Sequence, residues 1–293
     1  MSKVVRIERL ANILAASLTI YWAARGALLL SGGYRDLLIF TLRSMEHAGP
    51  FMASAWRFAA APFLLTAFVV FVRKDPVAPG RVEREFALLF QNLVLQGTVF
   101  FGALFAFGGL VRGEQLAKTL HHLLLEPVRR EVLLLGKYLA ALAATSVLFG
   151  GFSALAYLAL LSGEGRSAAS EHLASGGFGR LVAYVLVSVL ACAGYGAVFL
   201  AFGQWAKNPI LPALAFWGWE HLNFLLPAVL KRLGLVHYLL SLTPVKVPEG
   251  FLAVLGDPLP AWVAVPAPLL LAAALLALAS WRVRRTEVDY GVE

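Results

Sequence analysis

Long apolar runs alternate with short polar segments along the chain, and this pattern predicts its secondary structure. A helix that crosses a membrane needs roughly 20 apolar residues, and six runs reach that length. We therefore expect membrane-spanning helices at residues 51–72, 85–111, 132–161, 181–205, 210–230 and 261–281. The polar, glycine-rich residues 162–179 are expected to form an external loop between two of these spans.

The first 50 residues follow a different pattern and are expected to form an N-terminal interfacial region ahead of a transmembrane domain at residues 51–293. Residues 34–48 mix apolar and charged side chains, which is typical of an amphipathic helix lying in the membrane interface. Residues 10–30 are apolar but contain Arg25, so they form either an interfacial helix or a seventh span. Six spans leave both termini in the cytoplasm, whereas a seventh would place the N-terminus outside.

The composition favours a membrane fold over a soluble one. Hydrophobic residues make up 60% of the chain and charged residues only 14%, with a mean hydropathy of +0.76. Soluble domains contain about 25% charged residues. The expected fold class is therefore all-α: a polytopic integral membrane bundle of about six transmembrane helices with an N-terminal interfacial helix. The net charge of +8 fits basic residues that flank membrane helices and contact lipid, so no nucleic-acid partner is expected.

Residues 112–137 form a charged segment between two runs that contain no Asp, Glu, Lys or Arg, namely residues 86–111 and 138–163. A basic amphipathic segment that joins two spans is expected at the cytoplasmic surface, where a soluble partner can bind it. Read as a helix, the segment carries four leucines on one face: Leu116, Leu120, Leu123 and Leu124. The alternative is a loop that contacts only lipid.

Ten residues in this segment form an ordered pattern of an acidic residue, a Thr-Leu pair, two leucines, a proline, two arginines and a Gly-Lys pair. They are Glu114, Thr119, Leu120, Leu123, Leu124, Pro127, Arg129, Arg130, Gly136 and Lys137. With this pattern the segment resembles the loop after the second span in permease subunits of type-2 ATP-binding cassette (ABC) transporters. The chain departs from the family at Lys118, where a glycine is usual. The turn at residues 207–209, Trp219–Glu220 and the basic tail extend the resemblance over residues 51–293.

The resemblance implies an exporter permease in a bacterial-type cytoplasmic (inner) membrane, surrounded by lipid, with an unidentified substrate. Such a permease pairs with a second copy or a homologous permease and binds two ABC ATPase subunits, and the loop after its second span is the coupling helix that contacts the ATPase. The chain has no GxxxxGKS or GxxxxGKT phosphate-binding loop, so it is not expected to be an enzyme or to bind a cofactor. ATP and Mg²⁺ would be held by the partner.

Three residues of the expected fifth span are candidates for the transport path: Trp219, Glu220 and His221. A carboxylate in a span costs a few kcal/mol unless it is paired or hydrated, so it usually faces a cavity or a partner. The alternatives are a Glu220 that hydrogen-bonds to neighbouring helices and one that lies nearer the outer surface. No metal site is expected, because His121 and His122 would point about 100° apart on a helix.

Two other classes of function stay open at this point. An intramembrane enzyme would need a constellation such as His-Glu-x-x-His or paired aspartates in the spans, and the sequence has neither. An ion-coupled secondary transporter is typically built from internal repeats, and no repeat is detectable. Activity of the purified chain on a lipid or peptide would favour the enzyme, and gradient-driven flux without an ATPase would favour the secondary transporter.

Overall fold

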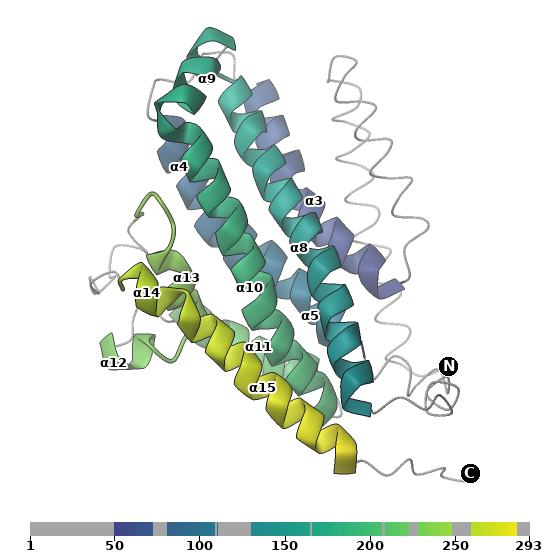
Figure 1. Ribbon diagram of the computed structural model, residues 1–293. Coiled ribbons are helices and arrows are strands. Elements are labelled where there is room, and N and C mark those ends of the chain that lie inside the picture. Colours follow the sequence, from purple (N-terminus) through teal and green to yellow (C-terminus); the bar gives the residue numbers. More distant parts are fainter. Residues whose placement is uncertain are drawn as a thin grey trace.

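The computed structural model describes residues 50–72, 81–108, 110, 130–164, 166–206, 209–222, 228–247 and 259–285. Within these ranges the chain forms helices and turns and no strand, so the expected all-α fold is confirmed for the described part (Figure 1). Four helical stretches are long and apolar enough to cross a membrane: Arg81–Gly108, Leu134–Ser162, Ser167–Trp205 and Ala261–Arg284. The interfacial helix expected before residue 50 lies outside the described residues.

The N-terminal part of the described bundle follows the apolar runs closely. Helix α3 spans Pro50–Val72, and the largely apolar stretch Arg57–Phe71 within it is shorter than a complete span. The next span is one continuous rod made of α4 (Arg81–Leu89), the π-helix η1 (Phe90–Val99) and α5 (Phe100–Gly108). Because a π-helix turns more widely than an α-helix, η1 changes the direction in which side chains leave the rod.

The expected external loop at residues 162–179 is wrong, because most of this segment is helical. Helix α8 (Arg130–Ser162) is followed by α9 (Arg166–His172) and the π-helical η2 (Leu173–Gly177), which leads directly into α10 (Phe178–Trp205). The chain bends within η2, where Gly176 has a φ of 107° that residues with a side chain rarely adopt.

The expected fifth span is not a single helix in the described part of the chain. Helix α11 covers Ile210–His221, and its 12 residues reach only about 18 Å, short of a hydrocarbon core of about 30 Å. The short helices α12 (Ala228–Lys231) and α13 (Leu235–Ser241) follow. The last span consists of α14 (Ala261–Ala264) and α15 (Pro266–Arg285). Six spans therefore stay a prediction, and four are supported.

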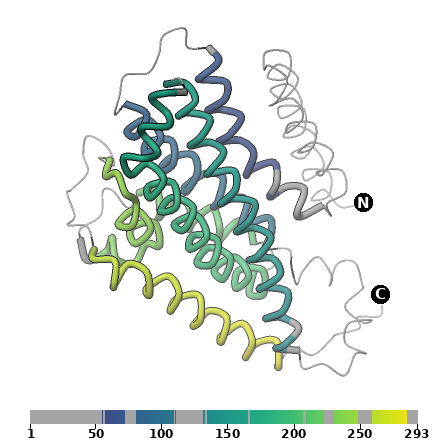
Figure 2. Tube along the Cα trace, turned by 45° about the horizontal axis from the view of Figure 1, so that its top comes forward, coloured from purple at the N-terminus to yellow at the C-terminus, as the bar shows by residue number. Residues whose placement is uncertain are grey.

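Helix α10 is the centre of the bundle and packs against α5, α8 and α15, while α3 covers α5 and α8 (Figures 1 and 2). Close approach of α5 and α10 depends on glycine: a Cβ on Gly203 would lie 2.5 Å from the carbonyl oxygen of Gly108. At the other extreme, α14 and α15 carry large apolar side chains on their outer face, with Trp262 79% and Leu270 69% exposed. An apolar exterior around a packed interior is what lipid as a solvent requires.

Candidate functional site

Most of the predicted ATPase-coupling residues lie outside the described residues. These are Glu114, Thr119, Leu120, Leu123, Leu124, Pro127 and Arg129. Arg130 is the first residue of α8, and Gly136 and Lys137 lie in its second turn. Gly136 is exposed, and a side chain there would meet open space. The coupling role of all ten residues stays a prediction.

Glu220, a transport-path candidate, is 2% exposed in the last turn of α11, and its carboxylate is completely engaged. Oε1 accepts the backbone N–H of Leu235 at 2.7 Å, and Oε2 accepts the backbone N–H of Val236 at 2.7 Å. The hydroxyl of Tyr195 on α10 donates to Oε2 at 3.2 Å. One carboxylate thus joins α10, α11 and the start of α13.

The Glu220 carboxylate lies where the first backbone N–H groups of α13 lack an acceptor. The first N–H groups of any helix lack partners inside the helix. The N-cap residue of α13 is Gly234, which has no side chain to accept them. Glu220 supplies the missing acceptor from another helix, and its negative charge lies at the positive end of the α13 dipole. Hydrogen bonds to a charged group each contribute about 1.5–3 kcal/mol, and they offset the cost of burying the carboxylate.

The other end of α13 is held by a cation. The ammonium of Lys246 donates to the carbonyl oxygens of Leu240 at 3.1 Å and Ser241 at 2.5 Å, and the hydroxyl of Thr243 also donates to Leu240 at 2.8 Å. Partial burial removes water from the ammonium and lowers the pKa of Lys246. Both charges match the helix dipole, so a helix of only seven residues is fixed at each end.

The two neighbours of Glu220 do not bind its carboxylate. Trp219 is 36% exposed on the surface of α11. The ring of His221 lies against Trp217, with 4.1 Å between the centroids, and its Nδ1 is buried without a partner among the described residues. Trp217 in turn donates its indole N–H to the carbonyl of Gln96 on η1 at 3.0 Å. The three transport-path candidates therefore point to different surroundings.

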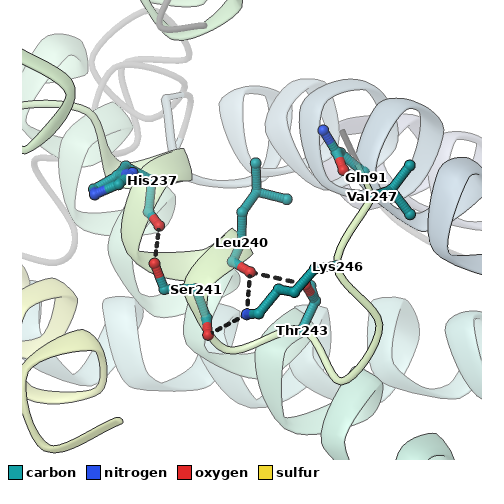
Figure 3. A pocket seen from close by; sticks show the side chains of 7 residues that line it. All are labelled: Gln91, His237, Leu240, Ser241, Thr243, Lys246 and Val247. Carbon is teal, nitrogen blue, oxygen red and sulfur yellow. Dashed lines mark hydrogen bonds between the residues drawn. The ribbon is translucent and has the colours of Figure 1, made fainter. Parts of the chain in front are cut away.

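Sequence reasoning missed Tyr195 and Lys246, because nothing in their local pattern links them to Glu220 or to α13. It also missed a cavity of about 80 Å³ beside α13. The lining residues, shown in Figure 3, are Gln91, His237, Leu240, Ser241, Thr243, Lys246 and Val247. Only the glycine before a short apolar stretch, Gly234, hinted that a helix begins there without a cap of its own.

A second polar cluster lies at the far end of the bundle, where α9 and η2 meet α4. The hydroxyl of Tyr157 lies 2.9 Å from His172 Nε2, which is 3.6 Å from a carboxylate oxygen of Glu83. His172 Nδ1 is 4.0 Å from Glu164, and Arg180 forms an ion pair with Glu83. The cluster connects α4, α8, α9 and α10. Across the described ranges, no three His, Cys, Asp or Glu side chains are placed to hold a metal ion.

The architecture is that of a helical protein compatible with several membrane crossings. The buried Glu220 carboxylate, which joins α10, α11 and α13, is called the carboxylate joint below. No protein-family model, no curated protein and no solved structure matches the chain.

Proposed function

We propose that this chain is the transmembrane permease subunit of an ABC transporter of the type-2 exporter class, driven by a separate ATPase subunit. The observation that carries the proposal is the charged segment 112–137, whose ten pattern residues match the coupling loop of that class. In this proposal the segment lies on the cytoplasmic side of a bacterial-type inner membrane. The permease acts as a dimer, and the ATPases bind ATP and Mg²⁺.

The packing at both ends of the segment suits a mechanical role. The ring of Phe107, at the end of α5, lies 5.5 Å from that of Tyr138, which is in the third turn of α8. The Tyr138 hydroxyl donates to the carbonyl of Ala193 on α10 at 2.8 Å. The segment between these two side chains therefore joins helices that are fastened to each other and to the central helix, and a force on it would reach α10.

The carboxylate joint then extends the connection from α10 to the short helices. Tyr195 lies on the same helix as Ala193, and Glu220 links it to α11 and α13. Binding and hydrolysis of ATP by the partner would move the segment, and α10, α11 and α13 would follow as one unit to change access to the transport path. Glu220 acts in this proposal by holding the moving parts together.

A direct test is to purify the tagged full chain from its native membrane in mild detergent and to measure Mg-ATP hydrolysis in the eluate. We expect an ATPase subunit to copurify with the wild type. Leu120→Asp and Arg130→Asp should each lower the copurified ATPase activity about ten-fold, because about 1.4 kcal/mol of lost binding suffices for that factor. Val77→Asp, the same apolar-to-acidic exchange on the expected outer side, is the matched control and should leave the activity unchanged. Undiminished activity in both test variants would contradict the proposal.

The side of the membrane can be tested independently by replacing His121 with cysteine and labelling intact cells with an impermeant maleimide. The native Cys192 is 0% exposed, so it contributes little background. We expect labelling only after the membrane is opened. Labelling in intact cells would place the segment beyond the reach of a cytoplasmic ATPase.

A further inference from the structure

The cavity beside α13 is much smaller than a site for a transported drug or lipid tail. Its volume is about 80 Å³, whereas pockets for drug-sized ligands have volumes of about 300–1,000 Å³. A water molecule occupies about 30 Å³ in the liquid, so the cavity has room for a group of a few heavy atoms. Figure 3 shows His237 and Ser241 of α13 on one side of it and Gln91 and Val247 on the other.

Gln91 is the first observation that points to a ligand. Its side chain lines the cavity, the residue is only 7% exposed, and its amide has no hydrogen-bond partner among the described residues. An amide that opens onto a cavity and has no protein partner can form hydrogen bonds to water or to a ligand there. Gln91 is the second residue of η1, and π-helical turns occur frequently at functional sites.

Lys246 is the second observation. An ammonium has three N–H groups, and two of them are used by the carbonyls of Leu240 and Ser241. The side chain lines the cavity, and the third N–H group has no hydrogen bond among the described residues. Thr243 has already donated its proton to Leu240, so its hydroxyl can only accept further bonds.

Among the residues that line the cavity, Lys246 carries the permanent charge. Lys231 and Arg232 both act on His237, whose pKa is lowered by burial and then by these two cations. The carboxylate of Glu220, the nearest acidic group in the α11–α13 unit, is occupied by the start of α13. A negative ligand would pair with the Lys246 ammonium that lines the cavity.

We propose that the cavity binds a single oxyanion of the phosphate type, with the Gln91 amide and the Lys246 ammonium as its donors. Gln91 lies ten residues after Arg81, the first residue of α4, which corresponds to a distance of about 15 Å along the helix axis. A soluble phosphate and the phosphate head group of a lipid share the chemistry that this site recognises. This site does not depend on the proposed coupling to an ATPase.

The first experiment uses the full chain in an uncharged, phosphate-free detergent and titrates inorganic phosphate by isothermal calorimetry at constant ionic strength. We expect saturable binding to one site. Gln91→Leu and Lys246→Met should each weaken binding about ten-fold, because each removes one hydrogen bond to a charged ligand. Arg232→Met is the matched control: it removes an exposed cation near the cavity that does not line it, and the affinity should change less than two-fold.

Folding of each variant is checked by its thermal unfolding without phosphate. If Gln91→Leu does not fold, Gln91→Glu takes its place, because it keeps the shape but exchanges the donor for a negative charge and should abolish binding. The second experiment repeats the series with micelles that contain phosphatidic acid and counts bound lipid by native mass spectrometry. Binding of inorganic phosphate that the lipid does not displace identifies a soluble anion, and variant-sensitive binding of lipid alone identifies a head group. Absence of saturable binding of either probe, or equal affinity in all variants, overturns the proposal.

Discussion

A charged side chain binds the backbone at each end of α13, but the two side chains lie in different environments. At the start of the helix the carboxylate of Glu220, 2% exposed, accepts two backbone N–H groups and the Tyr195 hydroxyl. At the other end the ammonium of Lys246 donates to two carbonyls, but the residue is exposed and faces a cavity. Both charges complement the helix dipole, yet burial makes the first contact a fixed part of the fold, while water and small ligands can reach the second.

The comparison implies that removing the buried charge has the largest effect. Glu220→Ala leaves the N–H groups of Leu235 and Val236 buried without an acceptor, and we expect the free energy of unfolding to fall by about 3–5 kcal/mol. Thermal unfolding of the purified chain in detergent measures the loss. Glu220→Gln keeps one acceptor oxygen and should lose about half as much. A loss below about 1 kcal/mol in Glu220→Ala would show that the joint is not fixed by the carboxylate.

The Tyr195 hydroxyl should have an intermediate effect. Tyr195→Phe keeps the ring that packs on Phe100 and Phe199 but removes the longest of the three hydrogen bonds to Glu220. We expect a loss of about 1 kcal/mol, because two donors to the carboxylate remain. Combining Tyr195→Phe with Glu220→Ala should add little to the single Glu220→Ala loss, since both act on the same contact. If the two losses simply added, the Tyr195 hydroxyl would stabilise the fold independently of the Glu220 carboxylate.

The exposed end of α13 should be less sensitive and should depend on salt. Lys246→Met in phosphate-free buffer is expected to lower the free energy of unfolding by about 0.5 kcal/mol, and the difference should shrink as ionic strength rises. The measurement is the same unfolding series at low and high salt. A loss as large as that of Glu220→Ala would remove the contrast between the two ends.

The smallest effect is a dependence on pH from His237, which lies in the first turn of α13 and lines the cavity. Its pKa is lowered from the ordinary value of 6.5 by burial and by Lys231 and Arg232. The unfolded chain therefore takes up a proton first as the pH falls, so stability should decline from about pH 6.5 down to the lowered pKa and be unaffected above pH 7. His237→Asn should lose this part of the pH dependence. If the wild type were more stable at acidic pH, the pH dependence would have the opposite sign, which would contradict a lowered pKa of His237.

The apolar runs determined where most long helices lie. The run at residues 51–72 became Pro50–Val72, the run at 132–161 became Arg130–Ser162, and the run at 181–205 became the main part of Phe178–Trp205. The physical reason is local. Lipid offers no hydrogen bonds to the backbone, so a long apolar segment satisfies its own N–H and C=O groups as a helix.

The segment at residues 162–179 shows where local pattern was insufficient. Its serines and glycines are typical of a loop, yet Ala169 and Leu173 pack against the core, and the contact between His172 and Tyr157 fastens the bend. Packing against neighbours stabilises short helices that propensity alone does not. The ATPase-coupling residues between 114 and 129 were chosen from sequence alone and stay a prediction.

The sequence by itself thus determined the helical class, the apolar exterior and the presence of a carboxylate within an apolar segment. Only the tertiary structure decided what that carboxylate does: Glu220 caps α13 because the bundle brings α11 and Gly234 together. The same is true of Gln91 and Lys246, which line one cavity although they are far apart in the chain. Such contacts depend on the packing of whole helices, and no local pattern encodes which side chain from one helix meets the end of another.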